Sequence, residues 1–181
     1  MNEINKFSFK PVDKSNWSDF EKLFESRGGP HSCWCMVWRA EGEELKHRDK
    51  INRKVYIKKR IDNKGPIGLL AYCNNESVGW CSIAPRETYR RLNGDDSSPN
   101  VWSIACFFIK RDFRGHGLTK KFIDEAIVYA GKNGAKFIEA YPVEPDSPSY
   151  RFMGYKHIFE EAGFRFIKKT GTRRNVMLKQ I

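Results

Sequence analysis

The sequence predicts a mixed α/β or α+β protein built around a central sheet. Short apolar runs rich in β-favouring residues alternate with stretches whose apolar residues recur at helical spacing. The longest apolar run, residues 101–109, leads through a glycine turn directly into one of these helical stretches. No repeat and no long linker interrupts the 181 residues, of which 40% are hydrophobic. We therefore expect one globular domain that spans residues 1–181.

The first half of the chain is expected to hold three strands and two helices. Alternation of apolar and polar residues predicts a strand over residues 7–12. Helical spacing predicts a helix that begins near Asn16 and ends before Gly28. The other expected elements are a second helix over residues 43–61 and a hairpin of strands over residues 67–73 and 78–84.

The second half repeats the alternation of strands and helices. Residues 93–100 are rich in Asn, Gly, Asp, Ser and Pro, which is typical of a loop. A stripe of apolar residues predicts a long helix over residues 118–133. The remaining expected elements are strands over residues 101–109, 137–141, 164–168 and 175–179 and a short helix over residues 156–162.

The compartment is inferred from hydropathy and cysteine usage. No run of about twenty apolar residues occurs, and the first six residues do not resemble a signal peptide. The five cysteines are an odd number in a chain large enough to fold without disulfides. We therefore expect a cytoplasmic protein with no membrane segment and no structural disulfide.

The chain carries a formal net charge of +11. A surface of this sign attracts polyanions, which include nucleic acid, anionic lipid and phosphorylated cofactors. Charge alone does not choose among these partners.

A glycine turn at the end of the longest strand is the most informative feature. The strand ends at Ile109, and the turn that contains Gly115 and Gly117 opens the helix that follows. Glycines let successive N–H groups converge, and a helix N-terminus adds unpaired donors and a positive dipole end. Such a turn suits a pyrophosphate. Four cations surround it: Arg111, Arg114, Lys120 and Lys121.

The turn resembles the acetyl-CoA signature of the GCN5-related N-acetyltransferase (GNAT) family. That signature is Arg or Gln, two residues, Gly, one residue, then Gly or Ala, and Arg114, Gly117 and Thr119 occupy its three defined places. Thr119 departs from the family pattern, although threonine is also small. The element order and the Ala-Gly-Phe at residues 162–164 extend the resemblance over most of the chain.

The resemblance implies a fold and a co-substrate. The fold is a mostly antiparallel sheet of six or seven strands with about four flanking helices. The co-substrate is acetyl-CoA, with no metal. The end of the long strand pairs with the pantetheine arm, the turn cradles the pyrophosphate, and the acceptor amine enters from the opposite side. The implied cofactor-binding residues are Phe107, Phe108, Ile109, Arg114, Gly115, His116, Gly117, Leu118, Thr119 and Lys120.

The reaction needs an oxyanion donor and an acid for the departing thiolate. The resemblance implies that a backbone N–H near Phe107 serves the oxyanion. Many members carry a tyrosine as the acid four residues before the glycine of the Gly-Phe pair, but here that position is Phe159. Tyr155 lies on the same short segment, one turn earlier if the segment is helical, and is our first candidate, followed by Tyr150 and then Tyr141.

The reaction also needs a base for the incoming ammonium. Glu139, in the middle of an expected strand, is the candidate base, and a chain of water molecules is the alternative to any single base. Cys106, beside the expected position of the acetyl group, raises a covalent acetyl-cysteine route. The sequence places no activating histidine beside it, so we expect direct transfer.

An aromatic and sulfur-rich segment covers residues 31–39. Its two cysteines are separated by one residue, which is too close for a zinc site, and no second ligand pair completes four ligands. Trp34, Met36 and Trp38 are expected either to form an apolar floor for the acceptor or the pantetheine arm, or to cover the core.

The expected function is acetyl transfer to the primary amine of a small molecule. Within the same family, a protein N-terminus or a lysine is the alternative acceptor, and the resemblance allows a homodimer. A non-catalytic nucleic-acid-binding module is the alternative from another class, but no motif of such a module occurs in the sequence. We expect no specific nucleic-acid partner.

Overall fold

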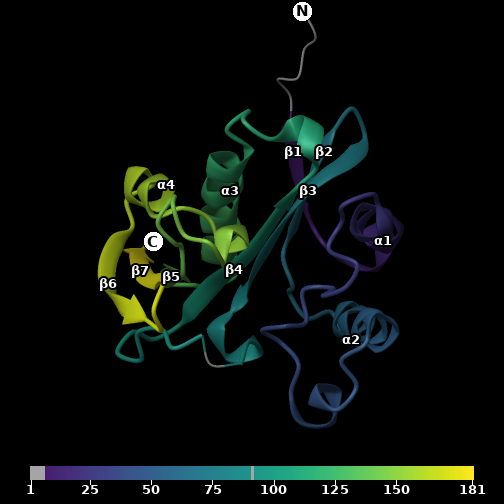
Figure 1. Ribbon diagram of the computed structural model, residues 1–181, viewed down its shortest axis with the longest axis horizontal. Helices are drawn as coiled ribbons and strands as arrows, with labels where there is room; N and C mark the ends of the chain where they lie inside the picture. The colour runs from purple at the N-terminus through teal and green to yellow at the C-terminus, as the bar shows by residue number, and fades with distance from the viewer. Residues whose placement is uncertain (1–6, 91) are drawn as a thin grey trace, which may run out of the picture.

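A seven-stranded sheet forms the centre of the molecule in a computed structural model that describes residues 7–90 and 92–181 (Figure 1). Its strand order is β1-β2-β3-β4-β5-β7-β6, and every neighbouring pair is antiparallel except β4 and β5. The strands are β1 (Phe7–Pro11), β2 (Leu69–Cys73), β3 (Glu76–Pro85), β4 (Val101–Ile109), β5 (Phe137–Ala140), β6 (Arg165–Thr170) and β7 (Arg174–Gln180).

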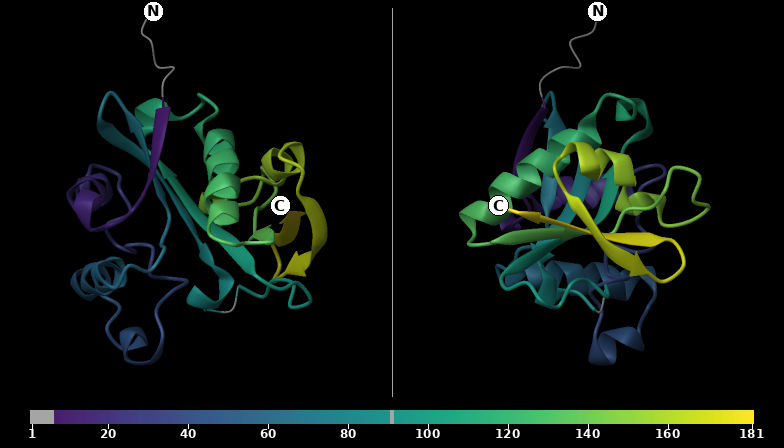
Figure 2. Two further views of the ribbon diagram at one scale, coloured as in Figure 1. Left: turned by 180° about the vertical axis from the view of Figure 1, so that it is seen from behind. Right: turned by 90° about the vertical axis from the view of Figure 1, so that its left-hand side faces the viewer.

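Four α-helices cover the two faces of this sheet. They are α1 (Trp17–Glu25), α2 (Lys50–Asp62), α3 (Leu118–Lys132) and α4 (Lys156–Glu161). Helices α1 and α2 lie on one face, whereas α3 and α4 lie on the other (Figures 1 and 2). The expected mixed sheet, mostly antiparallel and flanked by about four helices, is confirmed. In the described residues, no helix has the length and hydropathy that crossing a membrane requires.

Strand alternation builds a separate apolar layer on each face of the sheet. On β2, Leu69 and Ala71 pack toward α3, whereas Leu70 packs among the residues of α1 and α2. On β4, Phe107 belongs to the layer of α3, whereas the side chains of Cys106 and Phe108 pack against the layer of α1 and α2. The two faces of β4 therefore belong to two different apolar layers.

Strand β4 contains a bulge in its pairing with β3, and its pairing with β5 ends before the strand does. Ser82 pairs with Cys106 and Ile83 pairs with Ile104, so Ala105 is an extra residue, as in a β-bulge. The parallel pairing of β4 with β5 ends at the pair of Ile104 and Ala140. Beyond that pair, the last residues of β4 have no partner on the β5 side, which leaves backbone groups of Cys106 to Ile109 beside a gap.

The second helix begins later than the sequence predicts. The expected helix over residues 43–61 is replaced by a 3-10 helix over Gly42–Leu45 and an α-helix from Lys50. The Asp49 side chain accepts hydrogen bonds from the backbone N–H groups of Ile51 and Asn52, both at 3.0 Å. An aspartate at the N-cap therefore sets the start of α2.

Candidate active site

A groove of about 860 Å³ runs between the end of β4, the N-terminus of α3 and the segment around α4. Phe107, Phe108 and Ile109 line one side of it, and Tyr155 and Ile158 lie on the other. Every implied cofactor-binding residue except His116 lines this groove. Lining residues that the sequence did not single out are Phe113, Arg151, Phe152, Gly154, His157, Ile158 and Glu161.

The glycine turn leaves its backbone open to the groove. Gly115 has φ +80° and Gly117 has φ +70°, which is the left-handed region that favours glycine. A Cβ at either position would meet no atom within 4 Å, so packing inside the protein does not require these glycines. Gly117 is the N-cap of α3, and within the described chain no side chain caps this helix end. Its first N–H groups are thus free to bind an anion.

Two of the four cations around the turn line the groove. Arg114 is held over the end of β4, where its Nε donates to the carbonyl of Ile109 at 2.9 Å. Lys120 lines the groove and lies 3.9 Å from Glu161, a weak and exposed ion pair. Open glycines, uncapped N–H groups and two cations on one wall fit the pyrophosphate of coenzyme A.

A second cavity, of about 490 Å³, lies on the opposite face of β4. Val37, Trp38, Tyr89 and Tyr150 contribute its apolar and aromatic wall. Within the described residues no carboxylate lines it. Because the resemblance implies that the acceptor enters from this side, we call this hollow the acceptor cavity. It shares three residues with the groove: Phe107, Phe108 and Phe152. The two hollows therefore meet at the end of β4.

Of the three residues expected either to line the acceptor site or to cover the core, Trp34 and Met36 lie in the core. Trp34 is 2% exposed and Met36 is fully buried, and both pack in the core with α1 and Trp80. Their side chains fill space between the segment and helix α1, where Trp34 stacks on Phe24. Trp38 lines the cavity on the opposite face of β4, and its part in acceptor binding stays a prediction.

The three candidate acids lie in different surroundings. Tyr155 lines the groove at the N-cap of α4. Tyr150 lines the acceptor cavity, whereas Tyr141 is fully buried outside both. Phe159 is buried and packs against Phe107, with ring centroids 6.2 Å apart. The position at which many family members carry the acid is therefore a core position here.

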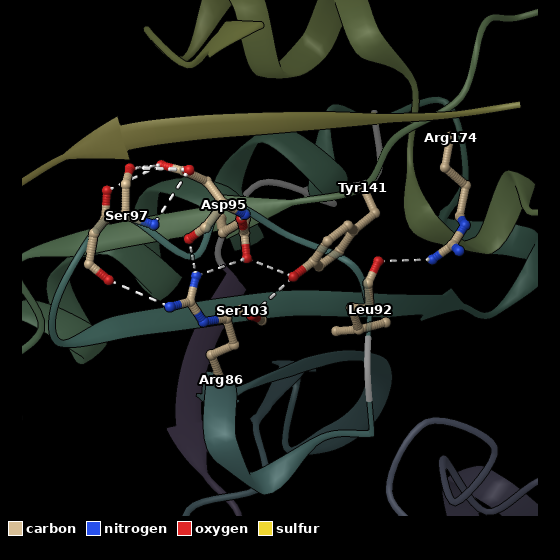
Figure 3. A network of polar contacts seen from close by, with 9 residues as sticks. Arg86, Leu92, Asp95, Ser97, Ser103, Tyr141 and Arg174 are labelled. Atoms are coloured by element: carbon tan, nitrogen blue, oxygen red, sulfur yellow. Dashed lines mark hydrogen bonds and ion pairs between the residues drawn. The ribbon is translucent and has the colours of Figure 1, made fainter. Parts of the chain in front are cut away.

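The structure does not bring the predicted base to either hollow. Glu139 is fully buried, and its carboxylate accepts hydrogen bonds from the Asp95 backbone N–H and, at 2.6 Å, from the Tyr141 hydroxyl. Arg86 lies 3.7 Å from the Glu139 carboxylate. Figure 3 shows the side chains of Arg86 and Tyr141 close to Asp95. Glu139 thus anchors the loop over residues 93–98 to β5, which is a structural task.

The surroundings of Glu139 also oppose ionisation. Burial raises the pKa of the Glu139 carboxyl above its ordinary value, against the hydrogen bonds from Tyr141 and Asp95 and the charge of Arg86. Both oxygens of Glu139 are engaged, and the residue lines neither the groove nor the cavity, so its geometry does not favour a role as the base.

Three cysteines line the acceptor cavity: Cys33, Cys35 and Cys106. All five cysteines of the chain are free thiols. From the sequence alone, Cys106 is considered as a nucleophile, and Cys33 and Cys35 only as metal ligands. That Cys35 and Cys106 line the same cavity depends on how residues 30–40 fold over β3 and β4, which no local pattern reports.

The family model described as the acetyltransferase (GNAT) family matches residues 15–156. The chain belongs to the GNAT acetyltransferase family. No curated protein sequence matches it closely enough to report.

Solved structures show the same fold at low sequence identity. The chain is similar to an acetyltransferase of the GNAT family from Streptococcus pneumoniae, with 13% identity, a TM-score of 0.58 and coverage of 97% and 99% of the two chains. It is also similar to the paia N-acetyltransferase from Thermoplasma acidophilum in complex with coenzyme A, with 14% identity, a TM-score of 0.57 and coverage of 98% and 100% of the two chains. A third similar structure is that of yncA, a putative acetyltransferase from Salmonella typhimurium, with its cofactor acetyl-CoA. The identity is 16%, the TM-score is 0.57, and the coverage is 97% and 94% of the two chains.

Proposed function

We propose that this protein is an acetyl-CoA-dependent N-acetyltransferase that transfers the acetyl group directly to the primary amine of a small molecule. The observation that carries the proposal is the pair of hollows on opposite faces of β4, which meet at Phe107 and Phe108. A donor in the groove and an acceptor in the cavity can react at this junction without a carrier. Two bound reactants held at one point gain the advantage of proximity.

The groove offers separate contacts for the parts of the donor. The N–H groups of residues 114–120 and the cations Arg114 and Lys120 suit the pyrophosphate. The end of β4, free of β5 beyond Ile104, suits the amides of the pantetheine arm. Acetyl-CoA, when bound, supplies a thioester whose carbonyl is open to attack by an amine.

The chain supplies the proton chemistry at the junction. A backbone N–H near Phe107 stabilises the oxyanion, and Tyr155, which lines the groove, gives a proton to the departing thiolate. Because Glu139 lies outside both hollows, we assign deprotonation of the amine to a chain of water molecules from the open side of the acceptor cavity.

The acceptor cavity favours a compact and largely apolar amine. Its volume of about 490 Å³ lies within the range usual for small-molecule sites. Trp38, Tyr89 and Tyr150 offer aromatic faces, and no described carboxylate stands ready to bind a second ammonium. A net charge of +11 further disfavours polycationic acceptors.

Calorimetry with acetyl-CoA, and with CoA and NAD for comparison, tests the donor site first. Micromolar binding at one site, about 8 kcal/mol, is the expected result. Release of CoA thiol in the presence of a panel of amines then tests the acceptor. Faster turnover with an aryl or alkyl amine than with spermidine or a lysine peptide supports the proposal. Turnover with peptides alone would assign the acceptor to a protein N-terminus or lysine.

We also propose that residues 1–181 form a single acetyltransferase domain located in the cytoplasm. Strands β6 and β7, which lie beyond the matched residues 15–156, pair with the same sheet through β5. The five free thiols suit a reducing compartment. Fluorescence imaging of the tagged protein would test the location.

A further inference from the structure

The cysteines of the acceptor cavity come from two segments far apart in the sequence. Cys33 and Cys35 belong to the segment over residues 30–40, whereas Cys106 lies on β4 beside the junction with the groove. All three line the cavity, although most of the Cys35 side chain is buried. None of them has a role in the proposed acetyl transfer.

Cys35 is surrounded by hydrogen-bond donors. The indole Nε1 of Trp80 donates to its sulfur at 3.2 Å, and both residues are buried in the layer beneath α1 and α2. The backbone of Trp34 and Cys35 is left-handed, with φ of +46° and +56°. Two consecutive non-glycine residues in this region are unusual, and the fold around them fixes where the Cys35 sulfur points.

A buried positive charge accompanies this thiol. Arg39 is 1% exposed, and its Nη2 donates to the Ile67 carbonyl at 2.8 Å, the Ser82 hydroxyl at 3.0 Å and the Tyr89 hydroxyl at 2.7 Å. All of these acceptors are neutral, and the buried Nε has no partner within the described chain. A buried guanidinium without a carboxylate is costly, which favours an anion nearby. The Cys35 sulfur can become that anion.

The same contacts favour the thiolate of Cys35. The neighbouring Cys106 thiol, the charge of Arg39, the Trp80 hydrogen bond and the nearby Ser82 hydroxyl lower the pKa of Cys35 to about 6, against the effect of burial. Burial and the neighbouring Cys35 raise the pKa of Cys33 to about 11, and the Cys35 contact and burial raise that of Cys106. The titratable and charged groups around Cys35 are Cys33, Arg39, Arg53, Cys81, Tyr89 and Cys106.

We propose that Cys35 is a site of oxidation by small hydroperoxides and that the oxidised sulfur then forms a disulfide with Cys106. The Cys35 thiolate attacks the peroxide and gains one oxygen, and water or an alcohol leaves with the second oxygen. The Cys106 thiol then bonds to the Cys35 sulfur and displaces water. For hydrogen peroxide, two thiols and one peroxide give one disulfide and two waters, and a small thiol reverses the change.

The consequence for activity rests on the proposed function. A disulfide between Cys35 and Cys106 joins the segment over residues 30–40 to β4 next to Phe107, where the two hollows meet. We expect the oxidised protein to bind acetyl-CoA as before, because the glycine turn is unaffected, and to lose most of its acetyl transfer. Reduction restores the transfer.

Mass spectrometry of the intact protein and of its non-reduced peptides tests the chemistry without any acceptor. After brief treatment with hydrogen peroxide, the parent protein should lose the mass of two hydrogens and yield one Cys35–Cys106 peptide. Cys106→Ser should instead keep a sulfenic acid on Cys35 that dimedone traps, and Cys35→Ser should show neither product. The rate should rise with pH to a plateau with a midpoint near 6.

Two matched variants serve as controls. Cys73→Ser removes a buried thiol that packs toward α3, and Cys33→Ser removes the other thiol of the segment; both should still form the disulfide. Circular dichroism verifies that each variant is folded. A Cys33–Cys35 disulfide as the main product, or oxidation of Cys35 no faster than that of Cys73, would overturn the proposal. Neither result would bear on acetyl-CoA binding, which calorimetry measures separately.

Discussion

At the scale of single residues, Gly117 combines an unusual backbone conformation with a place on the wall of the groove. Replacing it with valine imposes a Cβ at φ +70°, at a cost of about 1–2 kcal/mol in stability, and puts a branched side chain where the pyrophosphate would lie. We expect Gly117→Val to weaken acetyl-CoA binding by roughly tenfold or more. Calorimetry on the folded variant measures the loss.

Gly171 provides the matched control for that substitution. It also has a left-handed backbone, with φ +60° and no atom within 4 Å of an added Cβ, but it lies in the turn between β6 and β7. Gly171→Val should therefore show a similar loss of stability with unchanged acetyl-CoA affinity. Equal affinities for the two variants would remove the glycine turn from the donor site.

Tyr155 is the candidate acid that lies in the groove. Tyr155→Phe keeps the ring that stacks on His157 but removes the hydroxyl proton. We expect turnover to fall by roughly a hundredfold, the lower range for a general acid, with little change in acetyl-CoA affinity. Tyr150→Phe, on the acceptor side, should change the acceptor KM more than the turnover number. The reverse pattern would exchange the two roles.

At the scale of secondary structure elements, the loop over residues 93–98 is held by one buried carboxylate. Gly94 lies against Glu139, and a Cβ at Gly94 would collide with both carboxylate oxygens. Because those oxygens bind Asp95 and Tyr141, the side chain of Glu139 cannot move aside freely. Gly94→Ala should destabilise the protein by about 1–3 kcal/mol, which urea unfolding would measure.

Gly131→Ala is expected to have the opposite effect on stability to Gly94→Ala. Gly131 lies within α3, where an added Cβ would meet only Ile181 at 3.6 Å, an ordinary contact. Gly131→Ala should stabilise the protein by about 0.5–1 kcal/mol through helix propensity. Equal and small effects of the two substitutions would mean that the loop does not depend on Glu139.

Local patterns predicted most elements but not the contacts between them. The strand over 101–109 and the helix from Leu118 follow from hydropathy, glycine placement and spacing, and the structure confirms both. The predicted start of the second helix at residue 43 was wrong. The residues from 43 onward favour a helix by composition, but Asp49 caps α2 and makes it begin at Lys50. The bulge at Ala105 and the burial of Trp34 depend on packing between distant segments, so spacing alone could not report them.

At the scale of the whole molecule, the Cys35 thiolate links folding to pH. Its pKa is about 6 in the folded protein against an ordinary value of 9.0. Between these values the unfolded chain binds a proton that the folded chain lacks, so the free energy of unfolding should rise with pH. The contribution is complete above about 9 and is lost as the pH falls through about 6.

Urea unfolding under reducing conditions across this range measures the slope. Cys35→Ser should flatten it, whereas Cys73→Ser should keep the parent slope. The raised pKa values of Cys81 and Cys106 make the free energy of unfolding fall as the pH rises. This effect begins only above the ordinary thiol pKa of 9.0, so it lies outside the range between about 6 and 9.0. Identical slopes for the parent and Cys35→Ser would show that Cys35 is an ordinary thiol.

The net charge of +11 gives two predictions that separate a coenzyme A enzyme from a nucleic-acid binder. A duplex held through six or more phosphates should lose roughly a thousandfold in affinity between about 50 mM and 200 mM salt. Acetyl-CoA offers few phosphates, and backbone N–H groups of the turn bind part of that charge, so its affinity should fall by roughly tenfold or less.

Two charge reversals with the same change in net charge complete this test. Lys120 lines the groove, whereas Lys59 is exposed on α2. Lys120→Glu should weaken acetyl-CoA binding severalfold and Lys59→Glu should not, while both should weaken duplex binding to a similar and small extent. If both lysines mattered equally for acetyl-CoA, its attraction would come from the overall field of the protein. That result would contradict the assignment of the groove as the acetyl-CoA site.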